Sequence, residues 1–385
     1  TVSFPNFTIS MSQIAPFKRK RAVGEEKWYE KIKMTYSGVF QNQLTAHQND
    51  FLKKSLIKDW RNGMRHTLPI SATFNLFKYF NFTPNVTLND RMYSSKIRRQ
   101  WDPAASAEVR DTTYNFYNVF DFSGGISFDT KIYGFFKPMK FLGDKVQMIR
   151  HVLTPTVSFS ATPDFSSPGW GYYGTYDYTD KRTGEVITKK YPYFQHGIFG
   201  YPGQGKSGIL SYSLANNLEM KVKSDQDSTG VKKVSLIENF TLSQSYNFAA
   251  DSLNWSNINT SILLRLTKGF NLNLSATWDV YTYQLNSAGT PVRVNRTRLQ
   301  AGKGLGKLSS TGTSFSYTLN NETFKKLRRT KVNADGSSTS NENKSNSSKD
   351  SKFDSDGYAR WEFPWSLSVN YSISYAYGSF NKKKM

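Results

Sequence analysis

Apolar and polar side chains alternate one by one along much of this chain. From Asn271 to Val280 every even-numbered residue is apolar and every odd-numbered residue is polar. The same alternation occurs at 67–76, 155–161 and 365–377. A period of two is typical of β-strands whose two faces lie in different surroundings. The pattern therefore predicts an all-β protein.

The alternation predicts about thirteen strands, several of them longer than fifteen residues. Strands in soluble proteins usually have roughly five or six residues, so we favour a membrane barrel over a soluble β-sandwich, the alternative fold. A second face made of Ser, Thr and Asn suits a watery lumen. The expected strands span residues 3–11, 29–44, 65–77, 80–97, 114–136, 148–162, 207–223, 233–248, 256–267, 270–283, 292–305, 311–320 and 358–377.

The fold expected from this pattern is a transmembrane antiparallel β-barrel, and a partial one. Single-chain bacterial barrels ordinarily have an even number of strands, so about thirteen strands indicate part of a larger barrel. Residues 1–385 are accordingly interpreted as one outer-membrane barrel segment. The chain also shows no charged region followed by an apolar stretch at its start, so we expect a mature form or a fragment.

The connections between the expected strands alternate in length. Short ones lie at 78–79, 224–232, 268–269 and 306–307, and long ones at 98–113, 163–206, 284–291 and 321–357. In outer-membrane barrels the long loops lie outside the cell. We therefore expect 163–206 to be an aromatic-rich extracellular loop, able to fold over the barrel mouth. We expect 321–357, rich in Ser, Asn and Lys, to be a flexible extracellular loop.

Composition removes several classes of protein. No stretch reaches 18 uninterrupted apolar residues, so no transmembrane helix is expected, whereas a mean hydropathy of −0.58 is compatible with a membrane barrel. The absence of cysteine excludes disulfides and thiolate metal sites. With four histidines in the chain, we expect no histidine-rich metal site and no cofactor.

One motif has the letters of a phosphate-binding loop. Residues 200–207, GYPGQGKS, satisfy G-x-x-x-x-G-K-[ST]. That loop binds phosphate only where a helix begins at its lysine, yet residues 209–220 alternate as a strand does. We interpret the motif as a glycine-rich loop that leads into a strand.

No set of residues typical of catalysis is apparent. His47, His66, His151 and His196 are scattered, and no paired carboxylates or nucleophile beside a histidine stand out. The chain is therefore not expected to be an enzyme.

The formal net charge of +22 indicates either that the chain binds an anionic partner or that its basic residues are simply solvated. Basic residues with aromatic neighbours suit nucleic acid, but the basic runs lie in connections, so we expect no nucleic acid. A membrane rich in phosphorylated glycolipid supplies the same electrostatic partner. Within strands the basic residues fall on the polar face, where they give either general anion selectivity or a substrate path. The residues expected along this path are Lys131, Lys221, Lys223, Arg265 and Asn273.

Several short motifs, in their order and spacing, carry a resemblance to a known family. Residues 110–118 (RDTTYNFYN) lead into 120–128 (FDFSGGISF), followed by 149–159 (IRHVLTPTVSF); 63–70 (GMRHTLPI) and 363–368 (FPWSLS) fit the same template. Over most of its length the chain resembles the LptD family of outer-membrane lipopolysaccharide-assembly barrels, in the version found in Bacteroidota. The residues that carry the resemblance include Pro69, Arg110, Asp111, Gly124, Gly125, Arg150, His151, Pro155 and Pro364.

The resemblance implies a function and partners. Family members form a very large barrel in the cell outer membrane, enclose the plug lipoprotein LptE and receive lipopolysaccharide from periplasmic bridge proteins. A jellyroll domain precedes the barrel, and lipopolysaccharide leaves through a lateral opening between its first and last strands. This chain shows no jellyroll-like segment, so no gate residue is assigned. The resemblance implies a passive conduit that contacts outer-membrane lipids, and the alternative is a general porin or nutrient-uptake barrel.

Overall fold

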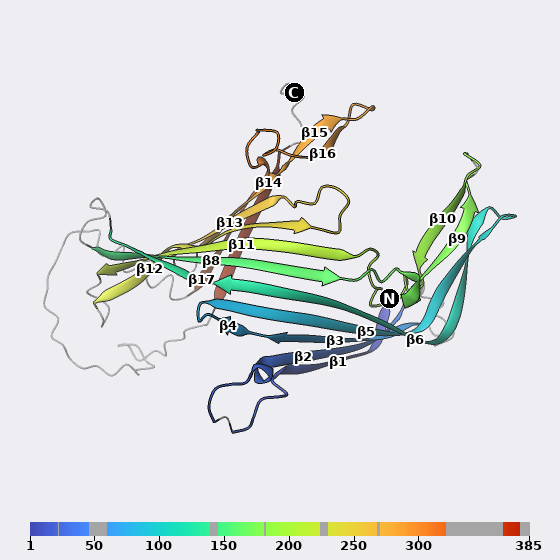
Figure 1. Cartoon of the computed structure of the whole chain (residues 1–385), viewed down its shortest axis with the longest axis horizontal. Helices are drawn as coiled ribbons and strands as arrows, with labels where there is room; N and C mark the ends of the chain where they lie inside the picture. The colour runs from blue at the N-terminus through green and yellow to red at the C-terminus, as the bar shows by residue number, and fades with distance from the viewer. Residues whose placement is uncertain are drawn as a thin grey trace, which may run out of the picture.

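The computed structural model describes residues 1–21, 23–45, 60–138, 145–180, 182–223, 230–267, 270–320 and 365–377. Its main feature is one large antiparallel sheet in which sequence neighbours pair with each other (Figure 1). The strands along its path are β1 (Val2–Ile14), β2 (Ile32–Leu44), β3 (Trp60–Ala72), β5 (Phe80–Asp102), β6 (Ala107–Thr130), β8 (Val146–Thr162), β11 (Ser207–Lys223), β12 (Val231–Asn247), β13 (Ile258–Thr267), β14 (Phe270–Asp279), β17 (Lys307–Asn320) and β18 (Ser366–Ala376).

Shorter elements extend or decorate this sheet. β4 (Phe74–Leu76) pairs with β5, and β7 (Ile132–Phe136) pairs with β8. Two separate hairpins stand at strand ends, and two 3-10 turns complete the structure. The hairpins are β9 (Tyr173–Thr179) with β10 (Val186–Pro192) and β15 (Tyr281–Leu285) with β16 (Pro291–Thr297); the turns are η1 (Trp28–Lys31) and η4 (Pro168–Trp170).

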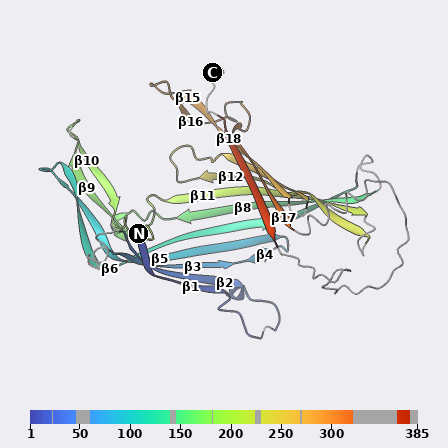
Figure 2. The same ribbon diagram turned by 180° about the vertical axis from the view of Figure 1, so that it is seen from behind.

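The path of the sheet is open. β1 and β18 are its end strands, and within the described residues each pairs with one neighbour only. The sheet curves, as Figures 1 and 2 show from opposite sides. The predicted antiparallel all-β fold is confirmed, and the open path is that of part of a barrel. No helical segment among the described residues is long and apolar enough to cross a membrane.

One predicted strand is not part of the large sheet. Residues 292–305 were expected to form a barrel strand, but β16 pairs only with β15, and β14 is followed in the sheet directly by β17. Residues 291–297 do form a strand, as their alternating pattern indicates. The backbone hydrogen bonds of this strand, however, are made with β15 and not with a strand of the large sheet. With one sheet strand fewer, the direction of every later strand is reversed relative to the expectation.

This reversal changes where the long connections attach. Phe270, at the start of β14, lies opposite Tyr317, and Asn320 at the end of β17 lies opposite Ser366. The connection after β17 therefore attaches at the end of the sheet that carries the β13–β14 turn, opposite to the end where 163–206 attaches. Residues 321–357 themselves lie outside the described residues, and the prediction of an extracellular loop there stays a prediction.

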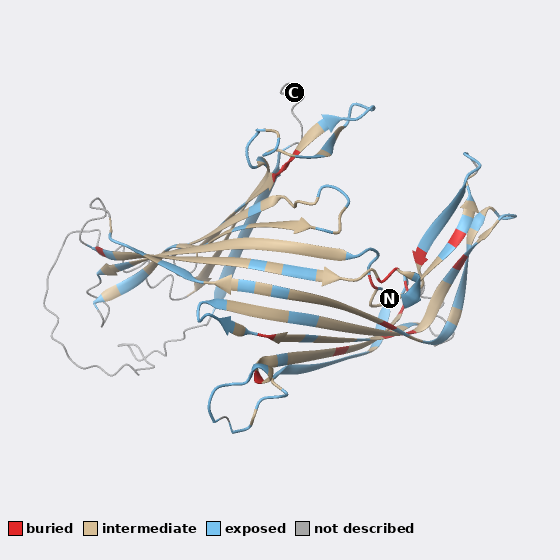
Figure 3. Ribbon diagram, viewed as in Figure 1, coloured by how far each residue is buried: buried red, intermediate tan, exposed pale blue. Residues whose placement is uncertain are grey.

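The two faces of the large sheet differ in chemistry. Directly paired residues share a face, and one face carries an apolar series across every strand of the path. Figure 3 shows that most of the sheet is exposed or intermediate, so no second layer built from the described residues covers it. Exposed apolar side chains on that face include Phe7, Ile9, Val86, Ile126, Phe128, Val157, Phe159, Leu242, Val369 and Ile373.

The opposite face is polar and internally hydrogen-bonded. Asn89 of β5 donates to Asp121 of β6 at 2.9 Å and accepts a hydrogen bond from Thr67 of β3 at 3.1 Å. Arg91 forms an ion pair with the same aspartate. A ladder of this kind links three strands on one face without any apolar packing. This polar face is the one that the sequence predicted to line a lumen.

Aromatic residues of 163–206 pack onto the polar face at one end of the sheet. Phe194, with 4% of its surface exposed, stacks on Tyr93 of β5 with ring centroids 5.4 Å apart, and Val119 of β6 is fully buried beside them. The Ile97 N–H donates to the carbonyl oxygen of Tyr193 at 2.9 Å. The β9–β10 hairpin lies alongside the far ends of β5 and β6 (Figure 1). Among the described residues, this segment supplies four of the eleven buried apolar side chains, namely Phe165, Tyr176, Tyr191 and Phe194.

Candidate functional site

The polar face carries a cluster of charged residues where β8, β11 and β12 meet. Lys221 of β11 lies directly opposite Lys233 of β12, and both are exposed. Beside them Arg150 of β8 donates to Glu219 of β11 at 2.5 Å. A cavity of about 150 Å³ is lined by these four side chains together with Phe135, Met148 and Met220.

The charges in this cluster do not cancel. The single carboxylate, Glu219, is engaged by Arg150, so Lys221 and Lys233 face each other with no anion of their own strands between them. Like charges directly opposite each other in a sheet are destabilising. A phosphate or carboxylate bound between the two ammonium groups relieves that repulsion, and the cluster, which we call the basic cluster, is therefore suited to bind an anionic group.

A second part of the polar face is neutral. Asn273 of β14 lies opposite Leu263 of β13 and Ser314 of β17. A shallow cavity of about 390 Å³ runs over this area. Its polar lining consists of Asn271, Asn273, Ser314, Ser316, Asn370 and Ser372. Amide and hydroxyl groups both donate and accept hydrogen bonds, so this polar wall is suited to sugar hydroxyls and water.

Arg265 lies at the edge of this wall. It is opposite Asn271 in the β13–β14 ladder and forms an ion pair with Glu238 of β12 at 3.5 Å. The structure therefore brings Arg265 and Asn273 together, and places Lys221 in the basic cluster. Lys223 lies opposite Val231, with its own N–H bonded to the Lys145 carbonyl. Lys131 is exposed between β6 and β7 and belongs to neither group.

The residues that carry the family resemblance are distributed over the sheet. Arg110 pairs with Glu108 at 2.9 Å near the far end of β6, and Asp111 lies opposite Arg98. Gly124 lies between Val86 and Ala161 on the apolar face. None of these three residues lies in the basic cluster or in the polar wall around Asn273.

Close packing explains why glycine is suited to position 125. A Cβ at this position would lie 3.1 Å from the Phe159 carbonyl oxygen and 3.2 Å from Oδ1 of Asn85. Pro69 and Pro155 pair within strands, opposite Thr87 and Leu214. The remaining motif residue, Pro364, lies outside the described residues.

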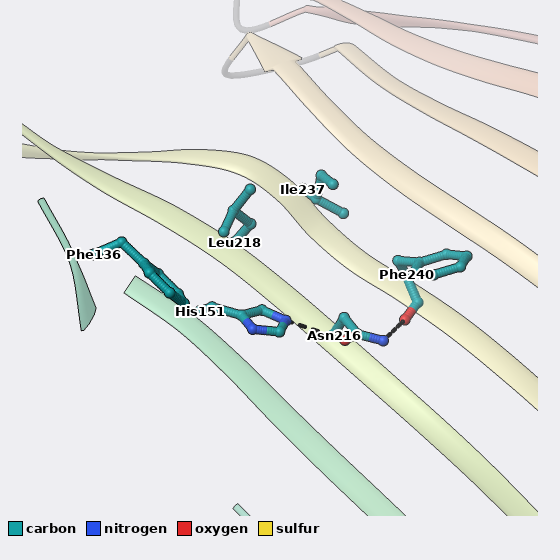
Figure 4. A pocket seen from close by; sticks show the side chains of 6 residues that line it. All are labelled: Phe136, His151, Asn216, Leu218, Ile237 and Phe240. Atoms are coloured by element: carbon teal, nitrogen blue, oxygen red, sulfur yellow. Dashed lines mark hydrogen bonds between the residues drawn. The ribbon is translucent and has the colours of Figure 1, made fainter. Parts of the chain in front are cut away.

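His151 takes part in a pocket on the apolar face (Figure 4). Its Nε2 is 3.1 Å from Oδ1 of Asn216, whose amide nitrogen donates to the Phe240 carbonyl at 3.3 Å. The cavity has a volume of about 290 Å³. Its remaining walls are apolar and come from Phe136, Leu218, Ile237 and Phe240.

The phosphate-loop motif does not form a phosphate site. Ser207, its last residue, begins β11, so a strand and not a helix follows the glycines. The Gly205 N–H already donates to the Asp164 carboxylate at 2.9 Å. The predicted interpretation, a glycine-rich loop before a strand, is confirmed. Within the described ranges no three His, Asp or Glu side chains are grouped so that they could hold a metal ion.

Sequence reasoning missed two members of the site. Lys233 and Glu219 were not singled out, although both occur in strands that were predicted. Their importance depends on register, since Lys233 matters only because it faces Lys221, and the alternation along each strand does not fix how far that strand slides along its neighbour.

The comparisons with known proteins give one match. A family model described as LptD protein matches residues 1–281, well over half of the 385 residues. No curated protein and no solved structure matches the chain.

Proposed function

We propose, because this chain belongs to the LptD family, that it is part of an outer-membrane translocon that inserts lipopolysaccharide into the outer leaflet. The observation that carries the proposal is the two-faced antiparallel sheet. A continuous apolar face suits contact with lipid chains, and a hydrogen-bonding, partly basic face suits a phosphorylated sugar. A lipid with a charged sugar head needs both surfaces.

The mechanism is that of a passive conduit. Phosphates of the head group are attracted by Lys221 and Lys233, because the nearby Glu219 is already paired with Arg150. Sugar hydroxyls exchange hydrogen bonds along the polar wall around Asn273. No bond is made or broken, so no titrating residue is required, and the energy for transport comes from outside this chain.

The location and partners that we propose are those that the family implies, and the two faces of the sheet are suited to them. The apolar face contacts outer-membrane lipids, and the polar face encloses the plug lipoprotein LptE, while periplasmic bridge proteins deliver the lipopolysaccharide. We place residues 163–206 outside the cell, because their aromatic residues close over the polar face at one end of the sheet. A chain that folds over the mouth in this way limits the leak of small solutes.

Depletion in cells distinguishes this function from that of a porin. When the protein is depleted, the amount of lipopolysaccharide that a membrane-impermeant label reaches at the cell surface should fall. Unexported lipopolysaccharide should accumulate inside the cell. Complementation with Lys221→Glu/Lys233→Glu should restore the protein level but not the surface lipopolysaccharide, and Lys232→Glu, on the other face, serves as the control. Unchanged surface lipopolysaccharide with reduced solute uptake would indicate a porin.

A further inference from the structure

The strands β12 and β13 separate along part of their length. Their ladder joins only Asn239–Ser243 of β12 to Asn259–Leu263 of β13. β12, however, begins at Val231 and β13 continues to Thr267. Within the described residues, 232–238 have no ladder partner on β13. The sheet therefore forks here, between the β11–β12 hairpin and the β13–β14 hairpin.

β12 is irregular at the same level. Its register with β11 shifts twice, between Asn216 and Leu218 and again between Leu218 and Glu219. Such bulges bend a strand and release its backbone groups. The side chain of Asn217 donates to the carbonyl oxygens of Glu238 at 2.8 Å and Ile237 at 3.4 Å. The amide of Asn217 thus stabilises the bulge, and with it the separation of β12 from β13.

The pocket of Figure 4 opens beside this fork. Ile237 and Phe240 supply walls from β12 itself, and Leu218 and Phe136 supply the opposite walls. The one polar pair, His151 and Asn216, lies on the floor of the pocket. Apolar walls over a hydrogen-bonding floor match an acyl chain that carries a hydroxyl or carbonyl group.

Cations lie a few residues further along the strands, on the other face of the sheet. Lys233 and Lys221 face the polar side of β11 and β12, and the Arg265–Glu238 ion pair spans the base of the fork. The lysines and the acyl-sized pocket thus lie on opposite faces of the same two strands, β11 and β12. A molecule lying across the edge of β12 contacts both.

We propose that this fork binds a phosphorylated, acylated glycolipid across the edge of β12. One acyl chain lies in the pocket lined by Phe136, Leu218, Ile237 and Phe240, and a phosphate of the head group lies at Lys221 and Lys233. This inference rests on the proposed function, and it adds a site within this chain where the transported glycolipid binds.

Charge distribution selects this occupant over a bilayer phospholipid. A phospholipid of the surrounding leaflet keeps its head group on the outside of the sheet, where the polar groups that line the pocket are those of His151 and Asn216. The facing pair Lys221 and Lys233 is on the inner face, and Lys232 is the one lysine of β12 on the outer face. A lipid that uses both must have its head group inside and a chain outside.

Photo-crosslinking tests the site in the full chain, purified with its bound partners into nanodiscs of phosphatidylethanolamine and phosphatidylglycerol with added lipid A. Azidophenylalanine replaces Phe136 in the pocket and, as the matched control, Phe128 on the same apolar face. Phe136 should yield lipid A adducts in excess over its share of the bilayer. Lys221→Gln/Lys233→Gln should lower them about tenfold, because charge-assisted hydrogen bonds are lost, whereas Lys232→Gln should not.

Two outcomes overturn the proposal. Adducts at Phe136 that follow bilayer composition and ignore the lysine variants would mean ordinary annular lipid. Lipid A adducts that persist when Leu218→Trp fills the pocket would place the lipid elsewhere. A crosslinker at Asn273 reports on the conduit independently, so labelling there without enrichment at Phe136 would refute the fork site and leave the proposed function intact.

Discussion

Lys221 and Lys233 are direct partners in the β11–β12 ladder, and both side chains reach solvent on the polar face. Placing two ammonium groups opposite each other costs roughly 0.2–1 kcal/mol relative to a neutral pair. An anion between them removes that cost. The repulsion between the two lysines therefore destabilises the sheet locally, and a bound phosphate group would remove that destabilisation.

Replacing one of these lysines should separate stability from binding. Lys233→Gln is expected to raise the free energy of unfolding by about 0.2–1 kcal/mol at low salt, because the repulsion disappears. It should also abolish most of the stabilisation produced by lipid A. Denaturant unfolding in detergent, with and without lipid A, measures both effects. Equal lipid A responses in Lys233→Gln and the control Lys232→Gln would contradict the role of the pair.

Neighbouring residues of β14 should respond oppositely to the same substitution. Leu274→Arg puts a charge on the apolar face and should cost about 2–4 kcal/mol if the residue lies near the bilayer midplane. Asn273→Arg puts it on the polar face and should be nearly neutral. Unfolding from lipid vesicles measures the difference. A similar loss from both variants would show that the apolar face does not meet lipid.

The far end of the β5–β6 hairpin should loosen in acid. Glu108 accepts hydrogen bonds from Tyr176 at 2.7 Å and from Arg99 and Arg110 at 2.9 Å, which lower its pKa to about 2. A carboxyl whose pKa falls on folding stabilises the folded state above its ordinary pKa of 4.5. That contribution is lost as the pH falls from about 4.5 to about 2.

Fluorine NMR of fluorotryptophan-labelled protein can follow this change. Trp101 lies 5.5 Å from the Tyr178 ring of β9, so its signal reports on the packing between β5 and β9. The signal should shift over this acid range in the wild type and stay constant in Glu108→Gln. A shift that persists unchanged in Glu108→Gln would assign the acid response to another group.

The strands were predictable because each one crosses between two environments. Alternation alone located β11 at 207–223, with the same bounds as in the structure. It failed at 292–305, because a hairpin standing clear of the sheet has the same alternation as a sheet strand. The β9–β10 hairpin was missed inside 163–206, although Gly184 at φ 74° is the kind of turn residue that marks a hairpin.

The aromatic segment should depend on one buried ring. Phe194→Ala removes the side chain that stacks on Tyr93 and is expected to cost about 3–5 kcal/mol of local stability, because it leaves a cavity. Protease cleavage within 163–206 should become faster, and cells should become more permeable to large antibiotics. Phe116→Ala, where the ring is 68% exposed, is the control. Equal cleavage in both variants would show that Phe194 does not hold the segment.

The site was less predictable than the strands. The sequence placed Lys221, Arg265 and Asn273 on the polar side, since that needs only the period of two. It could not pair Lys221 with Lys233 or open the fork at Glu238, because both depend on how far one strand slides along the next. Adjacent asparagines at 216 and 217, inside a strand, were the one local sign of an irregular ladder.

Photo-crosslinking in living cells can show whether lipopolysaccharide passes along the polar face of the sheet. A crosslinker at Asn273 reports on the polar face, and one at Leu274, the next residue, reports on the apolar face. We expect lipopolysaccharide adducts at Asn273 that disappear when lipopolysaccharide delivery is blocked, with bulk lipid labelled at Leu274. Bulk lipid at Leu274 and no lipopolysaccharide at Asn273, in correctly folded protein, would contradict this expectation.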